Sequence, residues 1–253
     1  MRRRSKQIFV AALLTMGLFW VFVLYTQLTL PNVDELKTKN PDSTAFMERY
    51  EGDMPLQYQW GSYSEISPYL KQAMVIAEDS AFFDHHGFDW QSIREAAQKN
   101  WSKKKLARGA STITQQLAKN LYLSPSKNPL RKIKETLITI ALEQRLSKQR
   151  ILEIYLNVVE WGEGIYGAEA AAQHYFKTKA ANLGPSQAAW LAAILPNPRY
   201  YQKHQGSAYA QRKVGRILGL MGAKKEEPRE VIIEEPPVDI FEEPPAEEIP
   251  EEF

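Results

Sequence analysis

An apolar run near the N-terminus is the feature that most constrains how this chain can fold. Residues 1–7 contain four basic side chains, and the apolar run extends from residue 8 to about residue 25 and, more weakly, to residue 30. About 20 apolar residues can cross a bilayer as a helix, and a basic cluster before them favours a cytoplasmic N-terminus. We therefore expect a cytoplasmic segment over 1–7 and a single-pass anchor over 8–30. The rest of the chain is then expected on the periplasmic or extracellular side of the cytoplasmic membrane.

A cleaved signal peptide is the alternative explanation of this run. Small residues at alternate positions would mark a cleavage site, but Tyr25-Thr26-Gln27-Leu28 stands where the run ends. The run is also long for the apolar core of a signal peptide. Both observations favour an uncleaved anchor.

The C-terminal end has a different composition. Residues 226–253 contain eleven Glu, Asp239, one Arg and six Pro, a composition typical of disorder, and we assign 223–253 to a disordered acidic tail. Subtracting these 12 acids and one base from the totals of 30 and 32 leaves residues 1–225 with 18 acids and 31 bases, a net charge of about +13. A basic body beside a membrane favours an anionic or lipid-phosphate partner, and we expect no nucleic-acid partner. The tail itself is equally well explained as a solubilising appendage.

Cysteine and histidine usage excludes several kinds of site. The chain has no cysteine, so a disulfide framework, a thiolate zinc site and a cysteine nucleophile are all excluded. Of its four histidines, His85 and His86 are adjacent, whereas His174 and His204 stand alone. This spacing does not fit a metal site built from histidines.

Between anchor and tail the sequence pattern is helical. Residues 31–66 form a juxtamembrane segment, in which the alternating Gln57–Trp60 favours a short strand or extended arm. Residues 67–222 are expected to form one all-α domain, with a turn-rich loop over 162–167 and a break at Pro196-Asn197-Pro198. The predicted helices cover 68–76, 89–99, a stretch beginning at Ser111 or Thr112, 129–146, 148–156, 168–176, 185–195 and 208–220.

Residues 109–120 predict a helix with an unusual polar face. At helical spacing, an apolar stripe of Ala110, Ile113, Leu117 and Leu121 lies opposite a face with a single formal charge. That face consists of Ser111, Thr112, Gln115, Gln116 and Lys119. Because an ordinary solvated face is rich in Glu and Lys, the pattern suggests a ligand-binding surface. The alternative is a helix start capped by Ser or Thr and followed by two surface glutamines.

Two further stretches contain candidate chemistry. Glu78 and Asp79 end an apolar helix and are followed by Phe82 and Phe83, so a partly shielded carboxylate could serve as a base near neutral pH. A lone acidic pair without chemistry is the alternative. Further on, the helix from Asn128 groups Arg131 and Lys132 with Glu135. The alternative there is a set of surface ion pairs that contribute little to stability.

The chain contains four ordered motifs: E-D-x-x-F-x-x-H-x-G from Glu78, G-x-S-T-I-x-Q-Q-x-x-K-N from Gly109, R-K-x-x-E from Arg131 and K-x-x-I-L-E-x-Y-L-N from Lys148. They resemble the motifs of the peptidoglycan glycosyltransferases. The resemblance covers roughly residues 68–201 and is specific because the order is kept. Thr139 stands where family members often have Ala, a departure that we expect to affect packing. The chain resembles the monofunctional type, which lacks a transpeptidase half.

The resemblance implies a lysozyme-like helical fold that polymerises lipid II, with Glu78 as the base that deprotonates the acceptor hydroxyl. The leaving group would be a pyrophosphate, which needs cations more than a proton; Lys119, Arg131 and Lys132 suit this role. Glu135 would orient these cations or bind a divalent metal, Mg2+ or Mn2+. The remaining substrate-binding residues implied by the motifs are Asp79, Phe82, His85, Ser111, Thr112, Gln115, Gln116 and Asn120. Expected partners are lipid II, the nascent glycan strand, the membrane and other cell-wall synthesis proteins.

Two other functions remain open at this point. A lysozyme-like hydrolase could share the fold, because fold alone does not separate cleavage from synthesis. The basic cluster argues against it, since a hydrolase of neutral glycan has no need of three cations. A non-catalytic, membrane-anchored scaffold of a cell-wall complex is the second alternative, and it predicts that Glu78 is dispensable.

Overall fold

The computed structural model describes residues 2–95, 111–126 and 128–222. Contacts divide the chain into two compact units. The first comprises Met1–Arg49, Ala81–Ser124 and Asn128–Val158, and the second comprises Tyr50–Ser80, Pro125–Lys127 and Val159–Phe253. Helices dominate both units, which confirms the expected all-α class.

The first helix, α1, extends over Arg2–Thr29. Within the described part of the chain it contains the only stretch, Lys6–Tyr25, that is long and apolar enough to cross a membrane. Its large apolar side chains are exposed, Ile8 and Trp20 among them. A helix that is apolar all round and packs against no core is typical of a membrane span.

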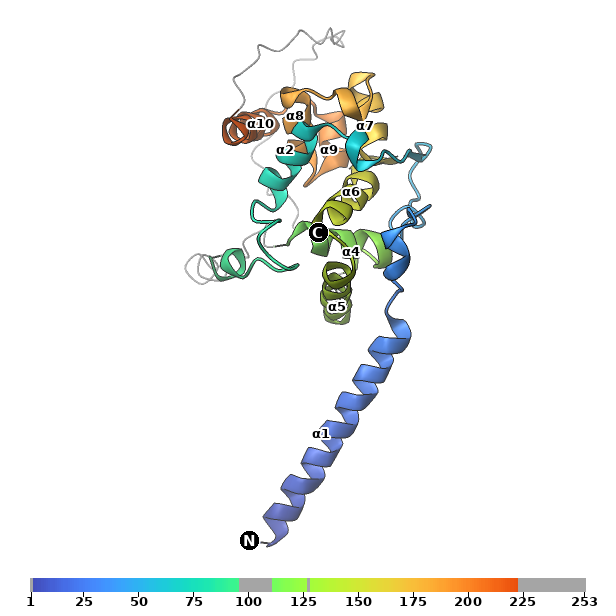
Figure 1. The fold of residues 1–253 in the computed structure, drawn as a ribbon, viewed down its shortest axis with the longest axis vertical. Coiled ribbons are helices and arrows are strands. Elements are labelled where there is room, and N and C mark those ends of the chain that lie inside the picture. The colour runs from blue at the N-terminus through green and yellow to red at the C-terminus, as the bar shows by residue number, and fades with distance from the viewer. Residues whose placement is uncertain (1, 96–110, 127, 223–253) are drawn as a thin grey trace, which may run out of the picture. The chain divides into compact units, whose positions relative to one another are not determined.

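The core of the first unit is built by three helices. In Figure 1, α4 (Ile113–Tyr122) lies beside α5 (Pro129–Arg145) and α6 (Lys148–Val158). The start of α5 follows from sequence: the Asn128 side chain accepts a hydrogen bond from the backbone N–H of Leu130, and proline occupies the first helical position. The helices bury their apolar stripes against one another, including Ile113, Leu117, Ile138, Leu142, Ile151 and Leu152.

The predicted start of helix α4 at Ser111 or Thr112 is confirmed, and the helix begins after the first residues of the stretch 109–120. Thr112 is its N-cap, in extended backbone conformation, and Ser111 precedes the helix. Gly109 and Ala110 lie outside the described residues. The Thr112 side chain fixes this start, because it accepts a hydrogen bond from the backbone N–H of Gln115 in the first turn.

The segment that follows α1 packs onto the first unit. It contains a short 3-10 helix, η1 (Asp34–Lys37), and buries Val33 and Leu36. Further on, the backbone N–H of Ala45 donates to the carbonyl of Leu121 at 3.0 Å. The juxtamembrane segment is therefore part of the folded unit along residues 33–47.

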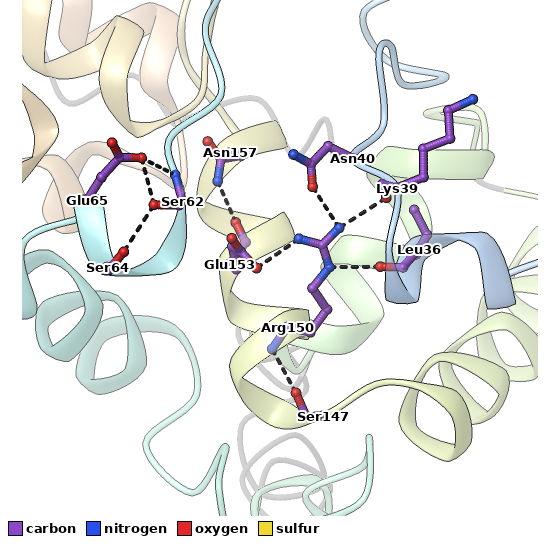
Figure 2. Close-up of polar contacts among 10 residues, drawn as sticks. All are labelled: Leu36, Lys39, Asn40, Ser62, Ser64, Glu65, Ser147, Arg150, Glu153 and Asn157. Carbon is purple, nitrogen blue, oxygen red and sulfur yellow. Dashed lines mark hydrogen bonds and ion pairs between the residues drawn. The ribbon is translucent and has the colours of Figure 1, made fainter.

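Arg150 fastens this segment to α6 (Figure 2). Its Nε donates to the carbonyl of Leu36 at 2.7 Å, and its Nη2 donates to the carbonyl of Lys39 at 3.0 Å and to Asn40 Oδ1 at 2.7 Å. Its Nη1 pairs with Glu153 at 2.8 Å. A planar guanidinium with several donors thereby holds an irregular segment that has few backbone partners of its own.

The second unit centres on α2 (Pro68–Glu78), α8 (Pro185–Ile194) and α10 (Ala208–Met221), which pack on one another. The predicted start of α2 is confirmed: Ser67 Oγ accepts from the N–H of Tyr69, and proline takes the first helical position. The same hydroxyl donates to the carbonyl of Leu183 at 2.6 Å. One serine thus caps α2 and ties it to the segment before α8.

A small sheet accompanies these helices. Strand β1 (Gln57–Tyr58) pairs in parallel with β3 (Ile165–Tyr166), which pairs antiparallel with β2 (Glu160–Gly162). The strand predicted near residue 57 is confirmed in shorter form, whereas the loop predicted over 162–167 includes a hairpin. The hairpin contains buried aromatic and β-branched side chains, which favour strands, and this explains why the segment is not an irregular loop.

Short elements complete the second unit: η2 (Tyr63–Glu65), α7 (Ala168–Phe176), η3 (Ala180–Asn182) and α9 (Pro198–Lys203). The expected break at residues 196–198 is followed at once by α9, because a proline fits the first position of a helix. In the first unit, residues 90–95 are helical and Asp89 Oδ1 accepts from the N–H of Ser92. The rest of the helix predicted over 89–99 lies outside the described residues.

Candidate active site

Glu135 lies at the centre of a cluster of charges on α5. It is 3% exposed, and each of its carboxylate oxygens accepts a hydrogen bond from a different cation. Arg131 Nη1 is 2.6 Å from Oε2, and Lys132 Nζ pairs with Oε1. Because the carboxylate is buried, these are not the ordinary surface ion pairs of the alternative interpretation. The geometry fits a carboxylate that orients two cations.

Lys119 is the third cation of this cluster. Burial lowers the pKa of Lys119, and the charges of Arg131 and, to a smaller extent, Lys132 lower it further, whereas the charge of Glu135 raises it. Lys119 makes no salt bridge within the residues that the structure describes. Three cations and one carboxylate leave an excess of two positive charges, which suits a phosphate or pyrophosphate group.

Other polar residues of α4 remain partly accessible. Gln116 is half-buried, and its Oε1 accepts the hydroxyl of Tyr155 at 2.8 Å, so its amide is held in one orientation. Asn120 is half-buried, and Ser111, just before the helix, is exposed. These residues and Lys119 leave hydrogen-bonding groups accessible along α4 and just before it.

Thr112 and Gln115, by contrast, are used to build the fold. They form a reciprocal cap in which Gln115 Oε1 accepts from the N–H of Thr112 at 3.0 Å and Thr112 Oγ1 accepts from the N–H of Gln115 at 3.2 Å. The hydroxyl of Thr112 also donates to the carbonyl of Gly87 at 2.7 Å. Both residues are buried. The predicted cap is confirmed, but Gln115 is not the surface glutamine of the alternative interpretation.

Gly87, the glycine of the first motif, meets Thr139 of α5. Its φ is +87°, and a β-carbon added there would lie 2.8 Å from Cγ2 of Thr139. Thr139 is fully buried, and its hydroxyl donates to the carbonyl of Glu135 at 2.7 Å. The one departure from the family pattern therefore lies in the packing between two motifs.

Phe82 and His85 belong to the loop that leads to Gly87. The Phe82 ring is fully buried and contacts the rings of Phe83 and His85 edge to face. His85 Nδ1 accepts from the N–H of Gly87 at 3.1 Å. Phe82 is therefore a core residue that supports the loop, and His85 is the more accessible of the two.

A buried polar network lies beside that loop. Glu143 accepts hydrogen bonds from the hydroxyl of Thr114 at 2.5 Å and from Lys148 Nζ at 2.8 Å. The ammonium of Lys148 also lies 4.4 Å above the ring centroid of Phe82. Neither Glu143 nor Thr114 is among the predicted site residues. These residues hold α4, α5, α6 and the loop together.

Glu78 and Asp79 belong to the second unit, whereas the other predicted site residues belong to the first. Glu78 is the last residue of α2 and is half-buried, and Asp79 is 7% exposed. Burial lowers the pKa of Lys213 on α10, and the charge of Glu78 opposes this. Lys213 is thus a cationic neighbour of the candidate base that sequence reasoning missed. The available signal was its place within the apolar spacing of Ala210, Val214 and Ile217 on α10.

The residues present do not form a ready site for a divalent metal. No group of three His, Cys, Asp or Glu that could hold an ion occurs in the described ranges. Both oxygens of Glu135 are already bound by cations. Mg2+ and Mn2+ prefer several oxygen ligands, so Glu135 fits the role of orienting cations better than that of a metal ligand.

Comparison with known proteins agrees with this arrangement. The transglycosylase family model matches residues 45–222. A protein of Chromobacterium violaceum named biosynthetic peptidoglycan transglycosylase is 49% identical over 214 residues, 82% of this chain and 93% of that protein. A protein of the same name from Methylobacillus flagellatus is 53% identical over 66% of this chain and 76% of that protein. Another, from Dechloromonas aromatica, is 46% identical over 83% of this chain and 94% of that protein.

The resemblance seen in the four motifs is confirmed by these matches. The family match begins at residue 45 and so includes the end of the juxtamembrane segment, and it ends one residue after α10. The family model matches most of the chain, and the chain covers 76 to 94% of the length of these three relatives. We conclude that the chain belongs to the transglycosylase family.

Proposed function

We propose that this protein polymerises the glycan strands of peptidoglycan. In the proposed reaction, the growing glycan linked to a lipid pyrophosphate is transferred to the GlcNAc 4-hydroxyl of lipid II. The observation that carries the proposal is the cluster of Lys119, Arg131 and Lys132 around the buried Glu135, with its excess of positive charge. The name shared by its relatives supports the same reaction.

The proposed chemistry needs one base and several cations. Glu78 accepts the proton of the acceptor hydroxyl. The hydroxyl oxygen forms a bond to the anomeric carbon of the donor glycan, and the configuration of that carbon is inverted. The bond from that carbon to the pyrophosphate oxygen breaks, and undecaprenyl pyrophosphate leaves with the electron pair. Because a pyrophosphate leaving group is already anionic, it needs charge neutralisation rather than a proton. Lys119 and Arg131 supply that charge, and Glu135 keeps Arg131 and Lys132 in place.

The polar residues of α4 have a different part in the proposal. Gln116, Asn120 and Ser111 contact sugar or phosphate oxygens, whereas Thr112 and Gln115 shape the start of the helix that presents them. A divalent ion enters the proposal only as a counter-ion of the substrate, since the described residues offer no ligand cluster for it. Neutral donors bind a sugar phosphate without the full strength of an ion pair.

The proposed setting is the outer face of the cytoplasmic membrane, with α1 as the anchor and the N-terminus in the cytoplasm. Helix α5 also exposes Leu130, Ile133 and Ile140, apolar residues that suit contact with lipid. A reporter that is active only outside the cytoplasm, fused after Gly222 in place of the tail, should be active. Activity of a reporter that works only in the cytoplasm, fused at the same position, would show the opposite orientation.

The activity test uses the full-length protein in detergent with labelled lipid II. We expect long glycan strands from the wild type and a loss on the order of 1,000-fold or more for Glu78→Gln, because the amide cannot accept the proton. Glu51→Gln, at an exposed position, is the matched control and should polymerise normally. Release of small muropeptides from finished peptidoglycan would favour the hydrolase instead, and absence of polymerisation by the wild type would favour the scaffold. Full activity of Glu78→Gln would show that Glu78 is not the base.

A further inference from the structure

The juxtamembrane segment reaches the residue that we assign to the substrate phosphates. The backbone N–H groups of Ala45 and Phe46 donate to the carbonyls of Leu121 and Asn120, at 3.0 and 3.4 Å. The last carbonyls of a helix have no partner within the helix, so these two contacts cap the C-terminal turn of α4. Lys119 lies in that same turn.

The side chain of Phe46 faces the same cation. Lys119 Nζ lies 5.4 Å from the centroid of the Phe46 ring, within the distance at which the face of an aromatic ring attracts an ammonium. Phe46 is only half-buried, whereas its neighbours Thr44, Ala45 and Met47 are buried. The neighbours therefore fix the backbone, and the ring is left to contact Lys119.

The position of this ring is held from two sides. The N–H of Met47 donates to Thr44 Oγ1 at 3.1 Å, and Arg49 Nη1 donates to the carbonyl of Ala45 at 2.6 Å, so residues 44–49 form a closed turn. Upstream, Arg150 binds the segment at Leu36, Lys39 and Asn40. A ring on such a segment has a fixed place relative to α4.

An aromatic partner has a chemical advantage at this point. A carboxylate beside Lys119 would also hold the ammonium, but it would cancel the charge that an anionic group must meet. The ring attracts the ammonium through its quadrupole and leaves its net charge unchanged. It also excludes water from one side of the ammonium, which strengthens its interaction with a phosphate.

We propose that Phe46 is a positioning residue of the active site, which holds the ammonium of Lys119 in place for the substrate pyrophosphate. The segment between the anchor and the catalytic domain then forms one wall of the phosphate site. This inference rests on the proposed function, because it assigns the phosphate contact to Lys119.

The test is a double-mutant cycle on the full-length protein in detergent with lipid II as substrate. A cation–π contact of this kind is worth about a factor of five in kcat/KM, so Phe46→Leu should lose about fivefold while Phe46→Tyr stays near wild type. In the Lys119→Met background, Phe46→Leu should cause no further loss, because the ring acts only through the ammonium. Phe46→Met repeats the measurement if Phe46→Leu lowers the melting temperature.

A matched control exists in the second unit. Lys71 Nζ lies 4.1 Å from the ring centroid of Tyr63, so Tyr63→Leu removes a similar contact from a cation that the proposal does not use. Its kcat/KM should stay within twofold of wild type.

The remaining outcomes separate this inference from the proposed function. If Lys119→Met is severely impaired but Phe46→Leu is not, or if Phe46→Leu loses as much in the Lys119→Met background as alone, the inference is overturned and the proposed function stands. If Lys119→Met polymerises like the wild type, both the phosphate role of Lys119 and the inference are wrong. Absence of polymerisation by the wild type would reject the proposed function itself.

Discussion

Two lysines of the first unit have the same kind of aromatic neighbour and different further contacts. Lys148 lies over Phe82 at 4.4 Å and pairs with the Glu143 carboxylate at 2.8 Å. Lys119 lies over Phe46 at 5.4 Å and has no carboxylate within salt-bridge distance in the described part of the chain. The charge of Lys148 is balanced by the Glu143 carboxylate, whereas the charge of Lys119 is not balanced by a carboxylate in direct contact among the described residues.

The difference shows how one fold separates support from binding. The Lys148 ion pair joins α5 to α6 and is almost removed from solvent, with exposed side-chain fractions of 18% and 6%. Burial lowers the pKa of Lys119 instead, and repulsion by the charges of Arg131 and Lys132 lowers it further. A cluster of like charges is unfavourable on its own, and an anionic ligand would relieve the repulsion. The predictions below test whether the two lysines differ in this way.

Lys119→Met should produce the largest effect, a loss of polymerisation on the order of 1,000-fold, or about 4 kcal/mol of transition-state stabilisation. The free energy of unfolding should not fall. The pKa of Lys119 in the folded protein is lowered, so its charged form at neutral pH is a cost to folding that methionine removes. Initial rates with lipid II and thermal melts measure the two quantities. A variant that melts well below the wild type would show that Lys119 supports the fold as Lys148 does.

Lys148→Met should show the opposite pattern. Among the described residues it leaves the buried carboxylate of Glu143 with Thr114 as its one hydrogen-bond partner, and removal of one member of a buried pair costs about 3 kcal/mol. Denaturant unfolding should reveal this loss, while kcat/KM of the fraction that remains folded changes by less than tenfold. A stable variant without activity would place Lys148 in the chemistry.

Lys119→Arg should give the smallest effect, a change in the pH profile. The pKa of Lys119 is lowered from its ordinary value of 10.5, so the protonated form, and with it kcat/KM, declines as the pH rises through a value below 10.5. Arginine stays protonated throughout this range, and its alkaline limb should lie at higher pH, with reduced activity at neutral pH because the guanidinium has a different shape. Profiles of kcat/KM report the free enzyme and serve as the measurement. Coincident alkaline limbs would show that this limb does not report Lys119.

Local sequence signals predicted the helices well. The caps at Ser67 and Asn128, each followed by proline, fix where α2 and α5 begin, because capping depends on a few neighbouring residues. The pairing of Arg131 and Lys132 with Glu135 follows in the same way from their spacing on one helix. These signals did not show which polar side chains are buried: Gln115, which the sequence placed on the polar face, is buried.

Contacts between distant segments were the part that sequence did not predict. The hydrogen bond from Thr112 to Gly87 joins residues 25 positions apart, and the bonds from Arg150 to the juxtamembrane segment span more than 100 positions. No local pattern encodes such contacts, because they depend on how helices pack. Phe46 was missed for this reason: it belongs to none of the four motifs, and only its contact with Lys119 of α4 suggests a role.

The attachment of the juxtamembrane segment by Arg150 has a consequence for how the enzyme meets its substrate. Only residues 30–32 separate the end of α1 from the buried Val33, and three extended residues span about 10 Å. A long flexible tether would let the domain sample a deep layer of solvent, whereas with α1 as the proposed anchor this short connection would keep the first unit near the bilayer. Capture of the proposed lipid-linked substrate would then be a search in two dimensions, in which the relevant concentration is the number of substrate molecules per unit of membrane area.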